Sequence, residues 1–228
     1  MRELVYYVAT SLDGWIADPD GDFSAFLNDP ATLGSLFERY PETCPAHLRD
    51  ALGVTGPARR FDTVLMGYRT YQPARDAGLR GGAYPHLRQI VATHRDLPSG
   101  PEVISGDLAS EVATLKAQPG ADIWLCGGAD LAGQVIDLID EIQVKINPVT
   151  LASGTPLLAS QPTPRVYTLT QADILPGGVI LATYRSGHPP SANALYSTES
   201  YRHEPVQVDG WCSAPLGPGG QARLTPRT

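Results

Sequence analysis

The chain has 228 residues, enough for one large domain or one domain with an appendage, and its 42% hydrophobic content is sufficient for a folded core. Its net charge of −7, with no basic stripe to offset it, argues against a nucleic-acid-binding or membrane-surface protein. No apolar run is long enough to cross a bilayer, and the N-terminal one is too short for a secretory signal, so we expect a cytoplasmic protein.

Strand-like and helix-like patterns alternate along the chain. The first part predicts, in order, a strand at 4–9, a loop or irregular strand at 11–22, a helix at 31–40, a helical turn within 47–52, a strand at 62–66 and a helix start at 68–72 that Pro73 limits or bends. The second part predicts strands at 89–93 and 103–105, a helix at 107–118 capped by Asp107, a strand at 123–126, a helix at 130–138 and a strand at 141–149.

The end of this pattern is a strand pair. Residues 165–170 and 179–184 flank a turn at Pro176–Gly178, which predicts two antiparallel strands. Because the preceding strands alternate with helices, we expect an α/β fold whose mixed, mostly parallel sheet is flanked by helices and has an antiparallel C-terminal edge.

The composition changes after Arg185. Residues 186–228 contain six prolines and five glycines and have no periodic apolar pattern. We therefore expect one domain at 1–185, followed by a tail at 186–228 that is poorly ordered or packed on the surface. The cysteines, Cys44, Cys126 and Cys212, form neither a metal-binding pattern nor an even disulfide framework, so no metal site is expected.

A strand that turns tightly into a helix is the most informative motif. The apolar run at 123–126 ends in Gly127 and Gly128, and a helical pattern that includes Ala129 and Leu131 follows. Adjacent glycines let a ligand approach the backbone closely, and the start of a helix favours a phosphate. The alternative is a tight packing joint without a ligand.

A second turn of the same kind lies at 63–71. A buried strand reaches Gly67 and a helix start follows, where Thr70 offers a hydroxyl and Arg69 a guanidinium for a phosphate. The alternative for Arg69 is an ordinary surface arginine.

Donors and positive charge also follow the strand at 89–93. Thr93, His94 and Arg95 come at its carboxyl end, where open α/β sheets bind ligands. Together the motifs predict a dinucleotide across this edge of the sheet, with a terminal phosphate near Arg69 and Arg95. The G-x-G-x-x-G pattern of the commoner dinucleotide-binding fold is absent from the sequence.

These segments resemble the dihydrofolate-reductase-like superfamily, and most closely the reductase domain of bacterial riboflavin biosynthesis and its stand-alone relatives. The resemblance rests on Val8–Ala17 with its Ser-Leu-Asp-Gly sequence, on Val64–Tyr71, on the strand end at Thr93, and on Leu125–Ala129. Asn147–Val149 and Gly154–Leu158 resemble a further glycine-containing run of the family. The match covers residues 1–185 in order, and the tail has no counterpart.

The resemblance implies NADPH as cofactor. By position, it implies that Ala9, Trp15 and Ile16 border the nicotinamide and that Gly67, Arg69 and Thr70 meet phosphates. It implies that Thr93, His94 and Arg95 surround the 2′-phosphate. It further implies that Gly127, Gly128, Ala129 and Leu131 cover the pyrophosphate and the ring, and that the chain forms a homodimer through sheet edges.

The implied chemistry is hydride transfer to a small heterocyclic substrate, similar to that of 5-amino-6-(5-phosphoribosylamino)uracil reductase. Asp13 is the expected catalytic residue, as a substrate ligand or as the group that positions a proton-donating water; the alternative is a turn with Gly14. Dihydrofolate reduction is a second possibility, although Asp22, Asp29 and Glu38 are unconvincing as the required pocket carboxylate. A nucleotide-binding protein without catalysis is a third.

Overall fold

The computed structural model describes residues 1–26, 29–79, 81–97, 100–159 and 164–187. Residues 1–189 form one compact unit, and the tail predicted at 186–228 lies almost wholly outside the described residues. Among the residues described, none of the helices has the length and apolarity that a bilayer crossing requires.

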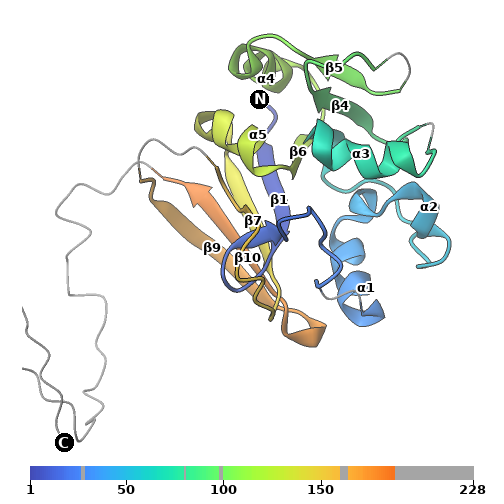
Figure 1. Ribbon diagram of the computed structural model, residues 1–228, viewed down its shortest axis with the longest axis vertical. Helices are drawn as coiled ribbons and strands as arrows, with labels where there is room; N and C mark the ends of the chain where they lie inside the picture. The colour runs from blue at the N-terminus through green and yellow to red at the C-terminus, as the bar shows by residue number, and fades with distance from the viewer. Residues whose placement is uncertain (27–28, 80, 98–99, 160–163, 188–228) are drawn as a thin grey trace, which may run out of the picture. The chain divides into compact units, whose positions relative to one another are not determined.

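An eight-stranded mixed sheet is the centre of the fold (Figure 1). Its strands, in spatial order, are β5 (Glu102–Ile104), β4 (Arg88–Ala92), β3 (Phe61–Gly67), β6 (Asp122–Gly127), β1 (Leu4–Thr10), β7 (Glu141–Ile146), β10 (Ile180–Ser186) and β9 (Tyr167–Ile174). The strands from β5 to β7 pair in parallel, whereas β10 pairs antiparallel with both β7 and β9. The predicted mostly parallel sheet with an antiparallel C-terminal edge is confirmed.

The helices cover both faces of this sheet. They are α1 (Pro30–Arg39), α2 (Ala46–Arg49), α3 (Tyr68–Asp76), α4 (Leu108–Ala117) and α5 (Ala129–Gln134). Asp29 caps α1 through hydrogen bonds from two backbone N–H groups, and Asp107 caps α4 as the sequence predicted. Helix α3 continues past Pro73 to Asp76, so this proline does not end the helix.

Alternation along β1 divides the core into two clusters. Leu4, Tyr6 and Val8 face a cluster to which α4 and α5 contribute. Val5 and Tyr7 face the other cluster, to which α1 and α3 contribute Leu36 and Tyr71. Because β1 is central and buried on both faces, its sequence is almost continuously apolar rather than alternating.

A second, two-stranded sheet joins the two loops that the resemblance identified. Strand β2 (Trp15–Ala17) pairs antiparallel with β8 (Thr155–Pro156). Gly154 makes this close approach possible, because a methyl group on its Cα would lie 2.0 Å from the carbonyl oxygen of Ala17. The loop or irregular strand expected at 11–22 is thus ordered by pairing with a segment distant in sequence.

Ion pairs gather at the end of the sheet where the parallel strands β1, β3, β6 and β7 begin. Arg60 contacts the carboxylates of Glu3, Asp122 and Glu141 there. Arg185 contacts Glu3 and Glu141 as well. This network connects the amino ends of four strands.

Candidate functional site

The carboxyl ends of β3, β4, β6 and β1 form one edge of the sheet, which we call the glycine edge. A methyl group placed on Gly67 would lie 3.9 Å from the Gly127 carbonyl oxygen and from the Gly128 amide nitrogen. The two glycine turns are therefore neighbours in space, although sixty residues separate them in sequence. Thr70 completes this group, because a methyl group on Gly127 would lie 3.5 Å from its hydroxyl oxygen.

At the two turns Gly67 and Gly128 are half-buried, whereas Gly127 is buried. Gly127 has a φ of +146°, and the Gly127–Gly128 peptide bond is cis. Gly67 precedes the nine-residue helix α3, and no side chain accepts a hydrogen bond from the first N–H groups of that helix. Those N–H groups and the positive end of the helix dipole favour a phosphate oxygen.

Cations gather along the same edge without acidic partners. The guanidinium of Arg95 lies 4.5 Å from the centre of the Tyr68 ring, and Arg69 is exposed at the start of α3. Neither forms an ion pair within the described part of the chain, whereas Arg2, Arg60, Arg88, Lys116 and Arg185 at the amino ends of the strands are all paired. Two arginines without ion pairs among the described residues thus lie where an anionic ligand is predicted.

The segment after β4 has its own local structure. The Thr93 hydroxyl accepts a hydrogen bond from the backbone N–H of Arg95, which turns the chain so that His94 and Arg95 are exposed. The structure thus places Thr93, His94 and Arg95 beside the β3 turn, since β4 pairs with β3 up to Ala92.

The remaining predicted residues lie at β1 and α5. Ala9 is half-buried near the end of β1, and Trp15 and Ile16 on β2 are also half-buried. Ala129 and Leu131 are buried, and Leu131 packs in the core cluster that includes α4 and α5. Because Leu131 is buried, it packs in the core beneath the glycine edge and is not exposed on its surface.

Asp13 joins two loops. Its carboxylate oxygens accept hydrogen bonds from the backbone N–H groups of Leu151 and Ala152, at 3.1 and 2.7 Å. The hydrogen bond with Ser11 and these backbone bonds lower the pKa of Asp13 below its usual range, so it is a carboxylate at neutral pH. Asp13 remains a predicted catalytic residue, with both oxygens already engaged in loop contacts.

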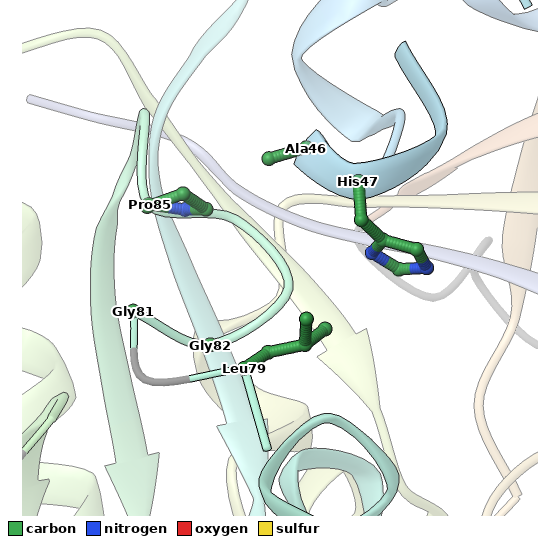
Figure 2. Close-up of a pocket in the computed structure, with 6 residues that line it drawn as sticks. All are labelled: Ala46, His47, Leu79, Gly81, Gly82 and Pro85. Carbon is green, nitrogen blue, oxygen red and sulfur yellow. The ribbon is translucent and has the colours of Figure 1, made fainter. Parts of the chain in front are cut away.

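Two surface cavities lie elsewhere. One, of about 420 Å³, opens between α2 and the segment before β4 and includes His47 and Leu79 (Figure 2). The other, of about 410 Å³, lies between α1 and β10 and includes Glu38 and Arg39. Neither is lined by a predicted site residue, so neither is the candidate cofactor site.

The comparisons with known proteins bear on this arrangement. Residues 2–181 match the family model described as the RibD C-terminal domain. The chain belongs to this family. Two curated proteins of Bacillus subtilis strain 168, the uncharacterized YyaP and YwjB, are 26% and 28% identical over 170 and 163 residues. These matches cover 68% of this chain in each case, and 80% and 82% of those proteins.

Solved structures similar to this RibD C-terminal domain agree on the fold. A putative riboflavin biosynthesis protein from Shewanella sp. PV-4 superposes with a TM-score of 0.60 at 21% identity, over 82% of this chain and 100% of that one. Dihydrofolate reductase from Enterococcus faecalis, complexed with NADP(H), gives 0.52 at 15% identity, over 82% and 97%. The fold is therefore dihydrofolate-reductase-like, as the sequence predicted.

Sequence reasoning missed one charged side chain of this RibD C-terminal domain. Lys145, on β7, pairs in register with Ala9 on β1, and its ammonium nitrogen lies 4.0 Å from the centre of the Tyr7 ring. In the sequence, Lys145 is one of the polar residues that alternate with Ile142, Val144 and Ile146 in the strand predicted at 141–149. A usable signal is composition, because the chain has only two lysines and this one lies inside a predicted strand, between Val144 and Ile146.

Proposed function

We propose that this protein is an NADPH-dependent reductase that transfers a hydride to a small heterocyclic substrate. The observation that carries the proposal is the meeting of Gly67, Gly127 and Gly128 at one edge of the sheet, beside cations that lack acidic partners. Membership of the RibD C-terminal domain family and the fold shared with an NADP(H)-bound reductase support it.

The residues of this edge fit the cofactor. The half-buried backbone at Gly67 and Gly128, the Thr70 hydroxyl and the N–H groups at the start of α3, which no side chain caps, are suited to phosphate oxygens. When bound, the reduced nicotinamide would supply the hydride. In this proposal Arg69 and Arg95 hold the 2′-phosphate, while Ala9 and Trp15 border the ring.

The substrate proposed is a pyrimidine related to 5-amino-6-(5-phosphoribosylamino)uracil rather than dihydrofolate. Folate reduction requires a carboxylate in the pocket, but Thr32 and Leu36 are the residues that α1 buries. Glu38 is exposed, and Asp22 and Asp29 accept hydrogen bonds from their own loop and helix cap. Among the described residues, α1 itself buries no carboxylate, which favours a pyrimidine over a pterin.

Removing the positive charge of the edge is expected to weaken NADPH more than NADH. Arg69→Ala and Arg95→Ala should each raise the Kd for NADPH by about 10- to 100-fold, since a hydrogen bond to a charged group contributes roughly 1.5–3 kcal/mol. Binding is measured by the quenching of protein fluorescence, for which Trp15 provides an emitter at the predicted site.

The matched control is Arg59→Ala. Arg59 is exposed near the opposite end of β3, and its backbone N–H, which the substitution leaves intact, donates to Glu42. This variant should bind NADPH as the parent does. Equal losses for NADPH and NADH in the Arg69 and Arg95 variants would contradict the 2′-phosphate assignment.

Turnover decides between a reductase and a binding protein. NADPH oxidation should occur with 5-amino-6-(5-phosphoribosylamino)uracil or a related pyrimidine, and not with dihydrofolate or quinones. Tight NADPH binding without oxidation across this panel would favour a nucleotide-binding protein that has lost catalysis.

A further inference from the structure

Lys145 is a cation without an acidic partner in the middle of the sheet. Strand β7 lies between β1 and β10, so Lys145 has strand neighbours on both sides, Ala9 and Leu181. Its ammonium group lies over the Tyr7 ring, and no hydrogen-bond acceptor or carboxylate contacts it within the described residues. Lys145 as a residue is half-buried.

This arrangement leaves the ammonium group incompletely satisfied. An ammonium has three N–H donors, and a ring face offers it a cation–π contact worth only about 0.5–2 kcal/mol. Burial lowers the pKa of Lys145 to about 8, against a small opposing effect from Cys126. A substrate atom with a lone pair would complete its contacts.

The position of Lys145 relates it to the proposed reaction. It lies beside Ala9, which is predicted to border the nicotinamide, on the face of the sheet that Tyr7 shares with α1 and α3. A substrate placed between that face of the sheet and the predicted nicotinamide ring would present its reducible bond to Lys145. No other lysine, and no histidine, is placed in this way among the described residues.

We propose that Lys145 contacts the substrate and donates the proton that accompanies hydride transfer. This inference rests on the reductase function proposed above. It assigns proton donation to Lys145, whereas the sequence suggested a water positioned by Asp13, whose oxygens accept hydrogen bonds from Leu151 and Ala152.

The step is balanced as follows. The carbon of a C=O or C=N bond takes the hydride, with its two electrons, from the reduced nicotinamide, which becomes oxidised. The π electrons of that bond move to the oxygen or nitrogen, and Lys145 transfers one proton from its ammonium to that atom. The neutral amine of Lys145 then regains a proton from water. A well-placed proton donor accelerates such a step by about 10²- to 10⁴-fold.

The titratable groups that face Lys145, Tyr7 and Cys126, do not titrate in the same pH range as the lysine. Tyr7 comes from β1 and is almost completely buried, and burial raises its pKa. Cys126 comes from β6, and burial raises the pKa of its thiol to about 12. Both remain protonated where Lys145 titrates, so a transition near pH 8 belongs to the lysine.

The test begins with the lysine itself. In the full chain labelled with ¹³C-lysine, the Cε region contains signals from only Lys145 and Lys116. Lys116 is ion-paired with Asp140 at the opposite end of the sheet and is the internal reference. We expect the signal lost in Lys145→Met to titrate near pH 8 and to shift when NADP⁺ and 5-amino-6-(5-phosphoribosylamino)uracil are added together.

Kinetics separates proton donation from charge alone. Lys145→Met and Lys145→Arg should both lower kcat by at least about 100-fold while the Kd for NADPH changes less than about twofold, because arginine keeps the charge but does not release a proton. The parent kcat should fall as pH rises through about 8, since the ammonium form is needed, and the residual rate of the arginine variant should lack this fall.

The outcomes distinguish the two proposals. Retained kcat in Lys145→Met, or a Lys145 signal that titrates near the ordinary lysine value of about 10.4, would overturn the role of Lys145 while leaving the reductase function intact. Recovery of kcat in Lys145→Arg would reduce its role to binding the substrate. Absence of NADPH binding and oxidation would overturn both proposals together.

Discussion

Replacing Arg60 with methionine is expected to lower the free energy of unfolding by about 1.5–3 kcal/mol, because the buried carboxylate of Glu141 loses one charged hydrogen bond and keeps that of Arg185. Arg60 is 2.6 Å from Glu141, whose side chain is only 5% exposed, and it also contacts Glu3 and Asp122. Burial disfavours its charge, but Glu141, Tyr40 and Asp122 raise the pKa of Arg60 above its ordinary value. The single guanidinium thus connects strands β1, β6 and β7 at their amino ends.

Urea denaturation measures this loss, and Arg88→Met is the control. Arg88 pairs with Glu102 at 2.7 Å, but the two side chains are 38% and 56% exposed. Exposed pairs contribute about 0–1 kcal/mol, so the control should change stability little. Similar losses of unfolding free energy in the two variants would show that the ion pairs of Arg60 stabilise the fold no more than an exposed pair does.

Replacing Gly127 with valine is expected to weaken NADPH binding by about 100-fold. The φ of +146° at this position is one that a branched residue does not adopt without strain, which costs on the order of 1–3 kcal/mol. In addition, the new side chain would extend toward Thr70 and cover the backbone on which the phosphates are predicted to lie. A loss of about 2.7 kcal/mol in binding corresponds to this factor.

Gly78→Val is the matched control for the strain. Gly78 also has a positive φ, +72°, but a side chain there would meet open space after α3. Both variants should lose some stability in thermal unfolding, and only Gly127→Val should lose NADPH affinity by fluorescence titration. Loss of affinity in both variants would indicate a general disturbance of the fold instead of a blocked edge.

The sequence was sufficient to predict the strands and glycine turns because each of these features is local. A buried run that ends in glycine before a helical pattern has the same meaning wherever it lies, and the parallel sheet then brings Gly67 and Gly127 to one edge. The antiparallel pair around Pro176–Gly178 was predictable for the same reason, since turn residues separate two short apolar runs.

Features that depend on contacts between segments distant in sequence were harder to predict from the sequence. The pairing of β2 with β8 involves only a few residues of each loop and relies on the close approach at Gly154. The importance of Lys145 follows from the central place of β7, which an alternating pattern does not reveal. The hydrogen bonds of Asp13 to Leu151 and Ala152 likewise span about 140 residues of sequence.

The location of the amino terminus has a practical consequence. Met1 is 95% exposed and precedes β1 at the end of the sheet where Arg60 lies, whereas the glycine edge is at the far end of the same strand. A linker attached through Met1 would therefore tether the protein to a bead or an electrode with the glycine edge turned toward the bulk solution. Immobilised in that orientation, the protein would remain accessible to nucleotides and to candidate substrates during screening.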